Sequence, residues 1–355
     1  MSKIKVAVLF GGASSEHDIS LVSATNIINN IPKDKYEVIC IGITKKGRWL
    51  YYPGDVNKIA SGEWKSNPDC TPAIISPDPM HKGIIKLESE ETSFKRIDVV
   101  FPAIHGANGE DGALQGLFEL AKLPYVGCDL GSSAVCIDKA LTHTVLEAAG
   151  IKMAKWRVLT HSDLNSIDEK CVQIASELGF PLFVKPACSG SSIGVNKAYD
   201  LESLESAVKL AFSHSKKVVV EEFISGRELE VAILGQDLVT ASAVGEICSC
   251  NDFYDYDAKY VLSSSKLSIP AQLELKVSDE IRKTAIKAYK AAGCAGLSRV
   301  DFFLTDDNEI ILNEINTMPG FTPISMYSKL MEDAGLDCGE LLDRLITIAL
   351  DRHQQ

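Results

Sequence analysis

The chain lacks any long apolar run. None of its 355 residues lies in a stretch approaching the ~18 consecutive apolar residues of a membrane-spanning helix. Near the N-terminus, the apolar run Val6–Phe10 ends at a Gly-Gly turn and is too short for the core of a signal peptide. Internal repeats and low-complexity segments are absent as well. We therefore expect a cytoplasmic globular protein without a membrane partner, built from two or three domains.

Paired cysteines and an excess of positive charge are also missing. The ten cysteines are scattered without a CxxC pair, which disfavours zinc motifs and is typical of free thiols in a reducing compartment. Asp and Glu (48) outnumber Lys and Arg (36), and the formal net charge of −12 argues against nucleic acid as the main partner. With 46% apolar and 24% charged residues, the composition is that of an ordinary globular protein.

The glycine fingerprint of dinucleotide-binding folds, G-x-G-x-x-G, is absent, which disfavours a nicotinamide dehydrogenase. Residues 3–10 nevertheless predict a buried strand that ends at a glycine turn. A helix is predicted over residues 19–29, with Ser15 or Asp18 near its cap. The carboxyl end of a strand is where α/β folds place ligands, so this turn is a candidate binding element.

A second buried strand is predicted over residues 98–104, and it delivers His105 to a loop with three glycines. A lone histidine is more often structural, but its place at the carboxyl end of a strand favours a functional role. Residues 123–127 predict the last strand of this first domain. The intervening residues 45–96, which contain several prolines, are interpreted as a strand-and-loop extension whose role the sequence leaves open.

The second half of the chain contains a possible phosphate loop. A strand over 180–186 carries Lys185, and residues 187–194 follow with glycines and three serine hydroxyls. Backbone N–H groups, hydroxyls and a lysine suit phosphate, although the lysine precedes the glycines, so this is not a Walker A loop. The alternative is a flexible Ser/Gly turn. Residues 246–266 interleave tyrosines with charges and predict a mobile loop that closes over a site.

A hairpin over residues 298–316 carries a cluster of charges. If a four-residue turn sets Leu304 opposite Glu309, then Arg299 lies opposite Glu314 and Asp301 opposite Leu312. One face then carries Arg299, Asp301, Glu314 and Asn316. Two carboxylates and a carboxamide are oxygen ligands that suit Mg²⁺, and arginine suits phosphate. The alternative is a surface hairpin with a structural salt bridge.

Six motifs, in order, resemble those of the D-alanine–D-alanine ligases of the ATP-grasp superfamily: GGASSEHDIS at the start, AIHGANGEDG, VKPACSGSSIG, FYDYDAKY, SRVDFF and NEINTMPGFTPIS. The resemblance covers essentially the whole chain. It implies an α/β (α+β) three-domain ATP-grasp fold. The expected parts are a Rossmann-like (pre-ATP-grasp) substrate domain over 1–127, a central ATP-grasp subdomain over 128–224, and a C-terminal subdomain over 225–355 with the metal site and the mobile loop.

The resemblance implies a nucleotide site and a metal site. Its expected residues are Lys139 and Lys185 for the ATP phosphates, Val184 for the adenine pocket, Glu221, Glu222, Phe223 and Ile224 for the hinge beside adenine, Glu228 for the ribose, Lys259 for the phosphates on loop closure, and Asp301, Glu314 and Asn316 for two Mg²⁺ (or Mn²⁺) ions.

The resemblance likewise implies an amino-acid site. Its expected residues are Glu16 for the ammonium of the first D-alanine, Ser191 and Tyr260 for a hydrogen-bonded triad with Glu16, His105 for the first carboxylate, Ser325 and Met326 for the second substrate, and Arg299 with the Gly320 N–H for the tetrahedral oxyanion.

The implied reaction joins two D-alanines through an acyl phosphate, for peptidoglycan precursor synthesis. A D-alanine–D-serine or D-lactate ligase of the same family is the alternative. The tyrosine loop favours the dipeptide over the lactate product, and the lack of a basic residue in Thr322–Tyr327 favours D-alanine over D-serine. A catalytically inactive nucleotide-binding protein would lack metal ligands or a lysine, and none is missing. The base for the incoming amine stays open between Tyr260, a phosphate oxygen and an amine that enters neutral. A homodimer is the family expectation.

Overall fold

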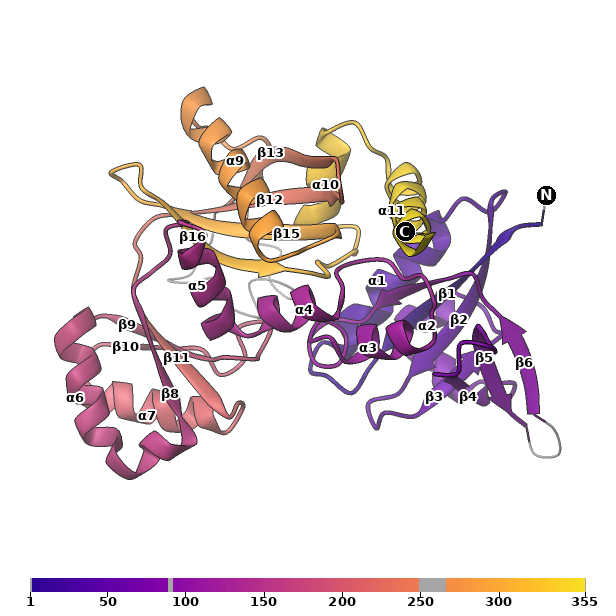
Figure 1. Ribbon diagram of the computed structural model, residues 1–355, viewed down its shortest axis with the longest axis horizontal. Coiled ribbons are helices and arrows are strands. Elements are labelled where there is room, and N and C mark those ends of the chain that lie inside the picture. Colours follow the sequence, from indigo (N-terminus) through magenta and orange to yellow (C-terminus); the bar gives the residue numbers. More distant parts are fainter. Residues whose placement is uncertain (1, 89–91, 249–265, 355) are drawn as a thin grey trace.

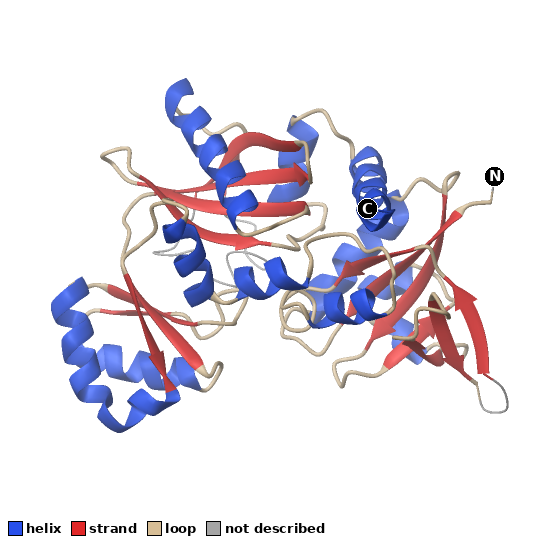
Figure 2. Ribbon diagram, viewed as in Figure 1, coloured by secondary structure: helices blue, strands red, loops and turns tan. Residues whose placement is uncertain are grey.

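The computed structural model describes residues 2–88, 92–248 and 266–354, and its strands form three sheets (Figure 1). Figure 2 shows the three sheets as separate red blocks with helices packed around them. Within these ranges, no helix has the length and apolar character that crossing a membrane requires.

The first sheet has seven strands in the order β6-β5-β4-β3-β2-β1-β7. The predicted opening strand is β1, and its residues Val6–Phe10 are completely buried, as expected for parallel strands covered on both faces. Residues 45–96 do extend this sheet, as predicted, by antiparallel strands and two short helical turns. The bounds are β1 Ile4–Gly11, α1 His17–Asn30, β2 Tyr36–Ile43, β3 Trp49–Tyr52, α2 Asn57–Ala60, η1 Glu63–Ser66, β4 Thr71–Ile75, β5 Gly83–Leu87, β6 Thr92–Arg96, β7 Val99–Ala103 and α3 Ala113–Leu120.

Two details of this first part differ from the sequence prediction. Helix α1 begins at His17, two residues before the predicted start, and its N-cap is Glu16, which lies next to Ser15 and makes no side-chain capping bond. The strand predicted over 123–127 is reduced to one isolated bridge between Val100 and Tyr125. The chain leaves the sheet there, because Gly127 takes a positive φ of 101°.

The second sheet has four antiparallel strands in the order β10-β9-β11-β8. Helices α6 and α7 lie along one face of it (Figure 1). They bury Val184 and Val220, whereas the neighbouring Lys185 and Glu221 point to the other face and line a cavity. The bounds are α4 Leu130–Ile137, α5 Lys139–Ala148, β8 Trp156–Thr160, η2 His161–Ser166, α6 Ile167–Leu178, β9 Leu182–Pro186, β10 Asn196–Ala198, α7 Leu201–Phe212 and β11 Lys217–Glu222.

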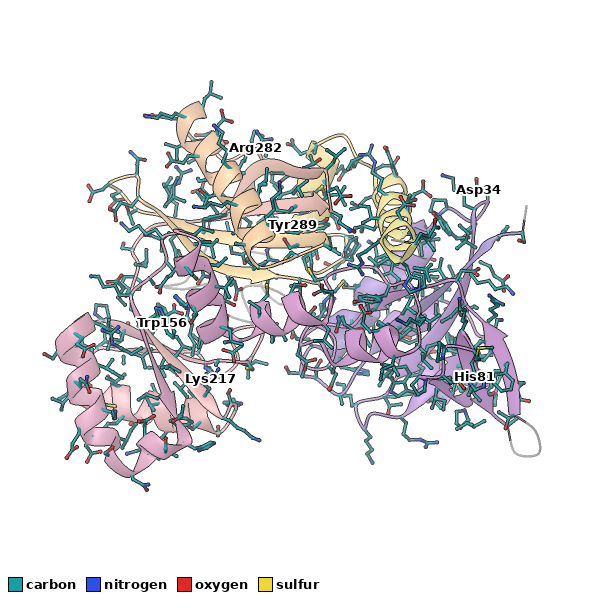
Figure 3. All side chains as sticks on the ribbon, in the orientation of Figure 1. Asp34, His81, Trp156, Lys217, Arg282 and Tyr289 are labelled. Carbon is teal, nitrogen blue, oxygen red and sulfur yellow. The ribbon has the colours of Figure 1, made fainter. Side chains whose placement is uncertain are left out.

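The third sheet has five antiparallel strands in the order β14-β13-β12-β15-β16. Helix α9 covers one face, and its buried Tyr289 donates a 2.6 Å hydrogen bond to the Gly235 carbonyl (Figure 3). The bounds are β12 Arg227–Gly235, β13 Val239–Cys248, β14 Lys266–Ser268, α9 Leu275–Ala291, β15 Gly296–Leu304, β16 Ile310–Asn316, α10 Met326–Asp333 and α11 Cys338–Gln354. The predicted loop over 246–266 is therefore strand at both ends, and its interior lies outside the described residues.

The C-terminal helices return the chain to the first sheet, as Figure 1 shows for α11. Asp343 of α11 accepts hydrogen bonds of 2.7 Å from both Lys35 and the Tyr36 hydroxyl. Arg352 donates to the carbonyls of Tyr125 and Gly127. Gly335, which has φ 88°, lies in the break between α10 and α11.

The hairpin of β15 and β16 has a register different from the predicted one. Leu304 pairs with Ile310, Asp301 with Glu314 and Arg299 with Asn316. Two causes combine. The turn has five residues, closed by the Thr305 N–H donating to the Glu309 carbonyl, and a bulge between the Phe302 and Asp301 pairs adds a residue to β16. The bulge changes which β16 residues face the cavity, which alternation along a regular strand cannot predict.

Candidate active site

A cavity of about 440 Å³ lies between the second and third sheets and reaches the first domain. It gathers seventeen of the twenty residues predicted for the site. These are Glu16, His105, Lys139, Lys185, Ser191, Glu221, Glu222, Phe223, Ile224, Glu228, Arg299, Asp301, Glu314, Asn316, Gly320, Ser325 and Met326.

Three predicted residues are not in the lining. The side chain of Val184 is fully buried in the core beneath α7, because it alternates with Phe183 and Lys185, which do face the cavity. Phe183, not Val184, therefore provides the apolar wall at this position. Lys259 and Tyr260 lie outside the described residues.

Lys139 and Lys185 form the cationic end of the cavity. Lys139 is the first residue of α5, and its Nζ donates to the Ser189 carbonyl of the 187–194 loop at 2.8 Å. The N-cap of α5 is Asp138, which Lys217 holds through a 2.6 Å ion pair from β11 (Figure 3 labels Lys217). Burial lowers the pKa of the Lys139 ammonium, while the nearby Glu314 carboxylate opposes the shift.

Glu221 is the buried counter-charge of Lys185. Its carboxylate accepts from Lys185 Nζ at 2.6 Å and from His143 Nε2 at 3.0 Å, and only 6% of the residue is exposed. Burial alone would raise the pKa of Glu221, but the Lys185 ammonium and the His143 hydrogen bond outweigh it and hold the pKa at about 2. The carboxylate is therefore charged, and it keeps the lysine oriented along the cavity wall.

Replacing Glu221 with glutamine is expected to destabilise the fold by about 3–5 kcal/mol, because Lys185 is left as an uncompensated buried charge. The folded pKa of about 2 lies below the ordinary 4.5, so this contribution is present above pH 4.5 and disappears as the pH falls toward 2. Urea unfolding of both proteins at several pH values measures it. The difference between them should be constant at neutral pH and shrink below pH 4.5.

Glu222→Gln is the matched control. This neighbouring carboxylate pairs at 3.3 Å with Lys155, whose side chain is 72% exposed, so its loss should cost only about 0–1 kcal/mol. Equal destabilisation by the two variants would contradict the distinction between a buried and an exposed pair.

The hairpin charges form the acidic end of the cavity. Arg299 Nε donates to Asp301 Oδ1 at 2.8 Å, and its terminal nitrogen donates to Asp301 Oδ2 at 2.7 Å. On the neighbouring strand β12, Glu230 lies 3.0 Å from Arg299 Nε. Burial would lower the pKa of Arg299, but the carboxylates of Asp301 and Glu230 raise it well above its usual value. Arg299 is thus a permanent, oriented cation at the wall of the cavity.

The oxygen donors of this end fit a hard divalent cation. Asp301 already accepts two hydrogen bonds from Arg299 and one from Asn316 Nδ2 at 3.0 Å, which leaves one lone-pair direction of its carboxylate. The described residues include no group of three or more His, Cys, Asp and Glu side chains suited to a metal ion. A cation here would therefore depend on the amide oxygen of Asn316 together with Asp301 and Glu314, a set that suits Mg²⁺.

Glu16 and Ser191 form the end of the cavity nearest the first domain. The Ser191 hydroxyl donates to Glu16 Oε1 across 175 residues of sequence. Glycines make room for this carboxylate, because a Cβ on Gly106 or Gly190 would lie 2.1 Å or 2.8 Å from Glu16 Oε2. His105 is buried beside them. Burial would lower its pKa, but Glu110 and Glu16 raise it.

Gly320, Ser325 and Met326 lie on the segment that follows β16. A Cβ on Gly320 would meet Ser325 Oγ at 2.8 Å, so glycine is required for the close approach of this turn. The Ser325 hydroxyl accepts from the Thr322 N–H at 3.0 Å and is thereby fixed at the start of α10.

Three residues that bind charged side chains of the site were not identified from the sequence. Glu230 pairs with Arg299, and His143 with Glu221. Alternation along a regular strand would put Asn313 on the face opposite Glu314, yet the bulge brings it to the cavity, where it accepts from Lys185 at 3.3 Å. His143 follows Lys139 by four residues on α5, which places the two side chains on the same face of the helix. This spacing was the available sequence signal for His143.

Two antiparallel sheets that hold lysines and an acidic cluster in one cleft define the chain as an enzyme of the ATP-grasp fold. The family models described as D-ala D-ala ligase N-terminus and C-terminus match residues 5–128 and 145–347. The chain belongs to the D-alanine–D-alanine ligase family, and it is therefore an ATP-dependent ligase.

Individual relatives support the assignment to this family. The D-alanine–D-alanine ligase of Caldicellulosiruptor bescii is 46% identical, over 100% of this chain and 97% of the relative, and that of Acetivibrio thermocellus is 47% identical, over 99% and 97%. Among solved structures, the VanG D-Ala:D-Ser ligase of Enterococcus faecalis has a TM-score of 0.90 at 40% identity, covering 98% of this chain and all of that one. The D-alanine-D-alanine ligase of Coxiella burnetii has a TM-score of 0.88 at 38% identity, covering 100% and 96%.

Proposed function

We propose that this chain joins two D-alanines into D-alanyl-D-alanine, with conversion of ATP to ADP and phosphate, and so supplies a peptidoglycan precursor. The observation that carries the proposal is the cavity itself. A carboxylate that suits an ammonium group (Glu16), lysines that suit phosphates (Lys139 and Lys185) and a buried arginine (Arg299) line one space. An enzyme that activates one amino acid and transfers it to another requires groups for the amino acid, for the nucleotide phosphates and for the developing oxyanion in one space.

In the first step, the γ-phosphoryl group moves from ATP to a carboxylate oxygen of the first D-alanine. Lys139 and Lys185 contact the phosphates as point charges, which accept phosphate without strict geometry. Glu221 to Ile224 border adenine, with Phe183 as the apolar wall, and Glu228 accepts from the ribose hydroxyls. Glu16 holds the ammonium of the first D-alanine, and His105 lies toward its carboxylate. The ATP oxygen–phosphorus bond breaks, and an acyl phosphate and ADP form.

In the second step, the amine of the second D-alanine, bordered by Ser325 and Met326, attacks the acyl carbon. A C–N bond forms, and negative charge develops on the former carbonyl oxygen. Arg299 and the Gly320 N–H stabilise this oxyanion, and the tetrahedral adduct then expels phosphate as its C–O bond breaks. The amine proton leaves to a base that stays open between Tyr260, a phosphate oxygen and solvent before entry.

Asp301, Glu314 and Asn316 would hold the divalent ions, two Mg²⁺ or Mn²⁺. Such ions neutralise charge on the transferring phosphate when bound. Lys259 and Tyr260 are proposed to complete the site when their loop closes, which excludes water from the acyl phosphate.

We propose the domain limits 1–127, 128–224 and 225–355, a homodimer, and a cytoplasmic location, since ATP and the amino acids are drawn from there.

Phosphate release by the purified protein, with ATP, Mg²⁺ and D-alanine, tests the proposal when the product is identified by mass. D-Alanine should stimulate phosphate release, and D-alanyl-D-alanine should be the product. ATP hydrolysis that ignores D-alanine, or the absence of dipeptide, would reject the function. An inactive nucleotide-binding protein predicts no D-alanine-dependent turnover at all.

A D-alanine–D-serine ligase is the second candidate, favoured by the likeness to VanG. Competition between equal concentrations of D-alanine and D-serine, in the presence of limiting ATP, separates the two. We expect D-alanyl-D-alanine to predominate, because no basic residue lies in Thr322–Tyr327 to alter the second-substrate wall. A predominance of D-alanyl-D-serine, or of the D-lactate ester in the parallel reaction, would reassign the second substrate.

A further inference from the structure

Two polar side chains of α1 hold the turn that carries Gly320. The Phe321 N–H donates to Ser23 Oγ at 3.2 Å, and Asn26 Nδ2 donates to the Phe321 carbonyl at 2.7 Å. Both backbone groups of the residue that follows Gly320 are thus bonded to the first domain, from positions 298 and 295 residues away in sequence. Neither Ser23 nor Asn26 lines the cavity.

The other side of the turn is held by the same network. His105 Nδ1 lies 3.0 Å from the Met318 carbonyl, and His105 Nε2 lies 2.9 Å from Ser23 Oγ. A carbonyl only accepts, so Nδ1 carries the proton in this contact, whether the ring is neutral or charged. Ser23 therefore joins the Phe321 N–H to His105, and His105 joins Ser23 to Met318. A closed ring of hydrogen bonds spans residues 318–321.

The peptide group between Pro319 and Gly320 takes no part in these hydrogen bonds, and both residues line the cavity. Pro319 has no N–H, and no acceptor for the Gly320 N–H lies within the described residues. Ser23 is fully buried, so its hydroxyl has no competing water contact. The Gly320 N–H is therefore an available donor at the cavity wall, and the residues on both sides of it, Met318 and Phe321, are held by hydrogen bonds.

We propose that Ser23 and Asn26 are positioning residues for the oxyanion donor, the Gly320 N–H. This inference rests on the proposed function, in which that donor stabilises the tetrahedral adduct. An oxyanion donor acts only when it lies about 2.7–3.1 Å from the developing charge, and it must be held to within about 0.5 Å by its supporting groups. Two residues of the first domain thereby affect oxyanion stabilisation, although Arg299 and Gly320 lie in the third sheet and in the segment that follows it.

The variants that test this are Ser23→Ala, Asn26→Leu and Asn26→Asp. The aspartate has nearly the shape of asparagine but cannot donate to the Phe321 carbonyl, which it would repel. Each variant should lower kcat by about 10- to 100-fold, which is less than the loss expected when the donor itself is removed. The KM for ATP should change by less than about twofold. Thr25→Val is the control on the same helix, because the Thr25 hydroxyl bonds back to the Leu21 carbonyl of its own helix.

A tetrahedral phosphinate analogue of the dipeptide separates positioning from general support. Its charged oxygen occupies the place of the oxyanion, so its inhibition constant should rise about as much as kcat falls. The inhibition constant of the planar product, D-alanyl-D-alanine, should stay near the wild-type value. A merely structural role of Ser23 and Asn26 would weaken both inhibitors equally, and that result would overturn the inference.

Failure of the proposed function and failure of the positioning role give different results. Wild-type protein that forms no dipeptide rejects the proposed function. Active wild type with Asn26 variants that keep normal kcat rejects the positioning role alone. Ser23→Ala removes a buried hydroxyl, so if it fails to fold, the half-buried Asn26 variants carry the test.

Discussion

Replacing Arg299 with methionine is expected to lower kcat by about 10²- to 10³-fold while ATP still binds, since this is the usual effect of losing one oxyanion donor. Arg299 pairs with Asp301 and Glu230, whereas Lys139 bonds to the Ser189 carbonyl and Lys185 to Glu221. The nucleotide contacts should therefore survive. Steady-state kinetics with calorimetric ATP binding on the same protein measures both parts.

Methionine also leaves Asp301 and Glu230 without their shared cation, so a second variant is needed. Arg299→Lys keeps the charge but loses the two-pronged hydrogen bonding to Asp301, and we expect it to recover stability more than rate. Arg344→Met is the control, because Arg344 forms an exposed pair with Glu340 on α11. A near-normal kcat for folded Arg299→Met would remove the oxyanion role from this residue.

Replacing Glu314 with glutamine is expected to raise the Mg²⁺ concentration needed for half-maximal activity by at least the 10- to 100-fold seen for supporting residues of metal sites, and to lower kcat. Asp301 has one remaining lone-pair direction, so its carboxylate cannot replace Glu314 as a ligand of the cation. Activity titrated with Mg²⁺ and with Mn²⁺ measures the effect, and Mn²⁺ binding followed by electron paramagnetic resonance checks it without turnover.

Glu309→Gln is the matched control on the same hairpin. Its carboxylate pairs with Lys152 at 2.7 Å, and both side chains are more than half exposed. It should leave the Mg²⁺ requirement unchanged. An unchanged requirement in Glu314→Gln as well would contradict the assignment of the metal ligands.

Local patterns in the chain were sufficient for most of the fold and for the types of residue in the site. The opening strand, the glycine turns at strand ends, the tail helices around Gly335 and the two lysines each have a short-range signal. The spaced motifs tied these to one family, and seventeen of the twenty predicted site residues line one cavity. Strand alternation also contained the information that excludes Val184, whose neighbours Phe183 and Lys185 face the cavity instead.

The tertiary structure decided what depends on contacts between distant segments. The bulge in β16 accompanies a backbone bond from the Leu312 N–H to Lys152, a residue outside the hairpin, and it brings Asn313 to Lys185. The pairing of Glu230 with Arg299 and of His143 with Glu221 follows from strand and helix packing.

The sequence by itself determined which chemical groups the chain has and which family it resembles, because residue type and local spacing are properties of short segments. Only the tertiary structure decided how those groups are aimed. The turn at Gly320 is local, but its orientation comes from Ser23 and Asn26, almost 300 residues earlier. Hydrogen bonds act over about 3 Å in space, whatever the distance along the chain, so no local pattern could predict them.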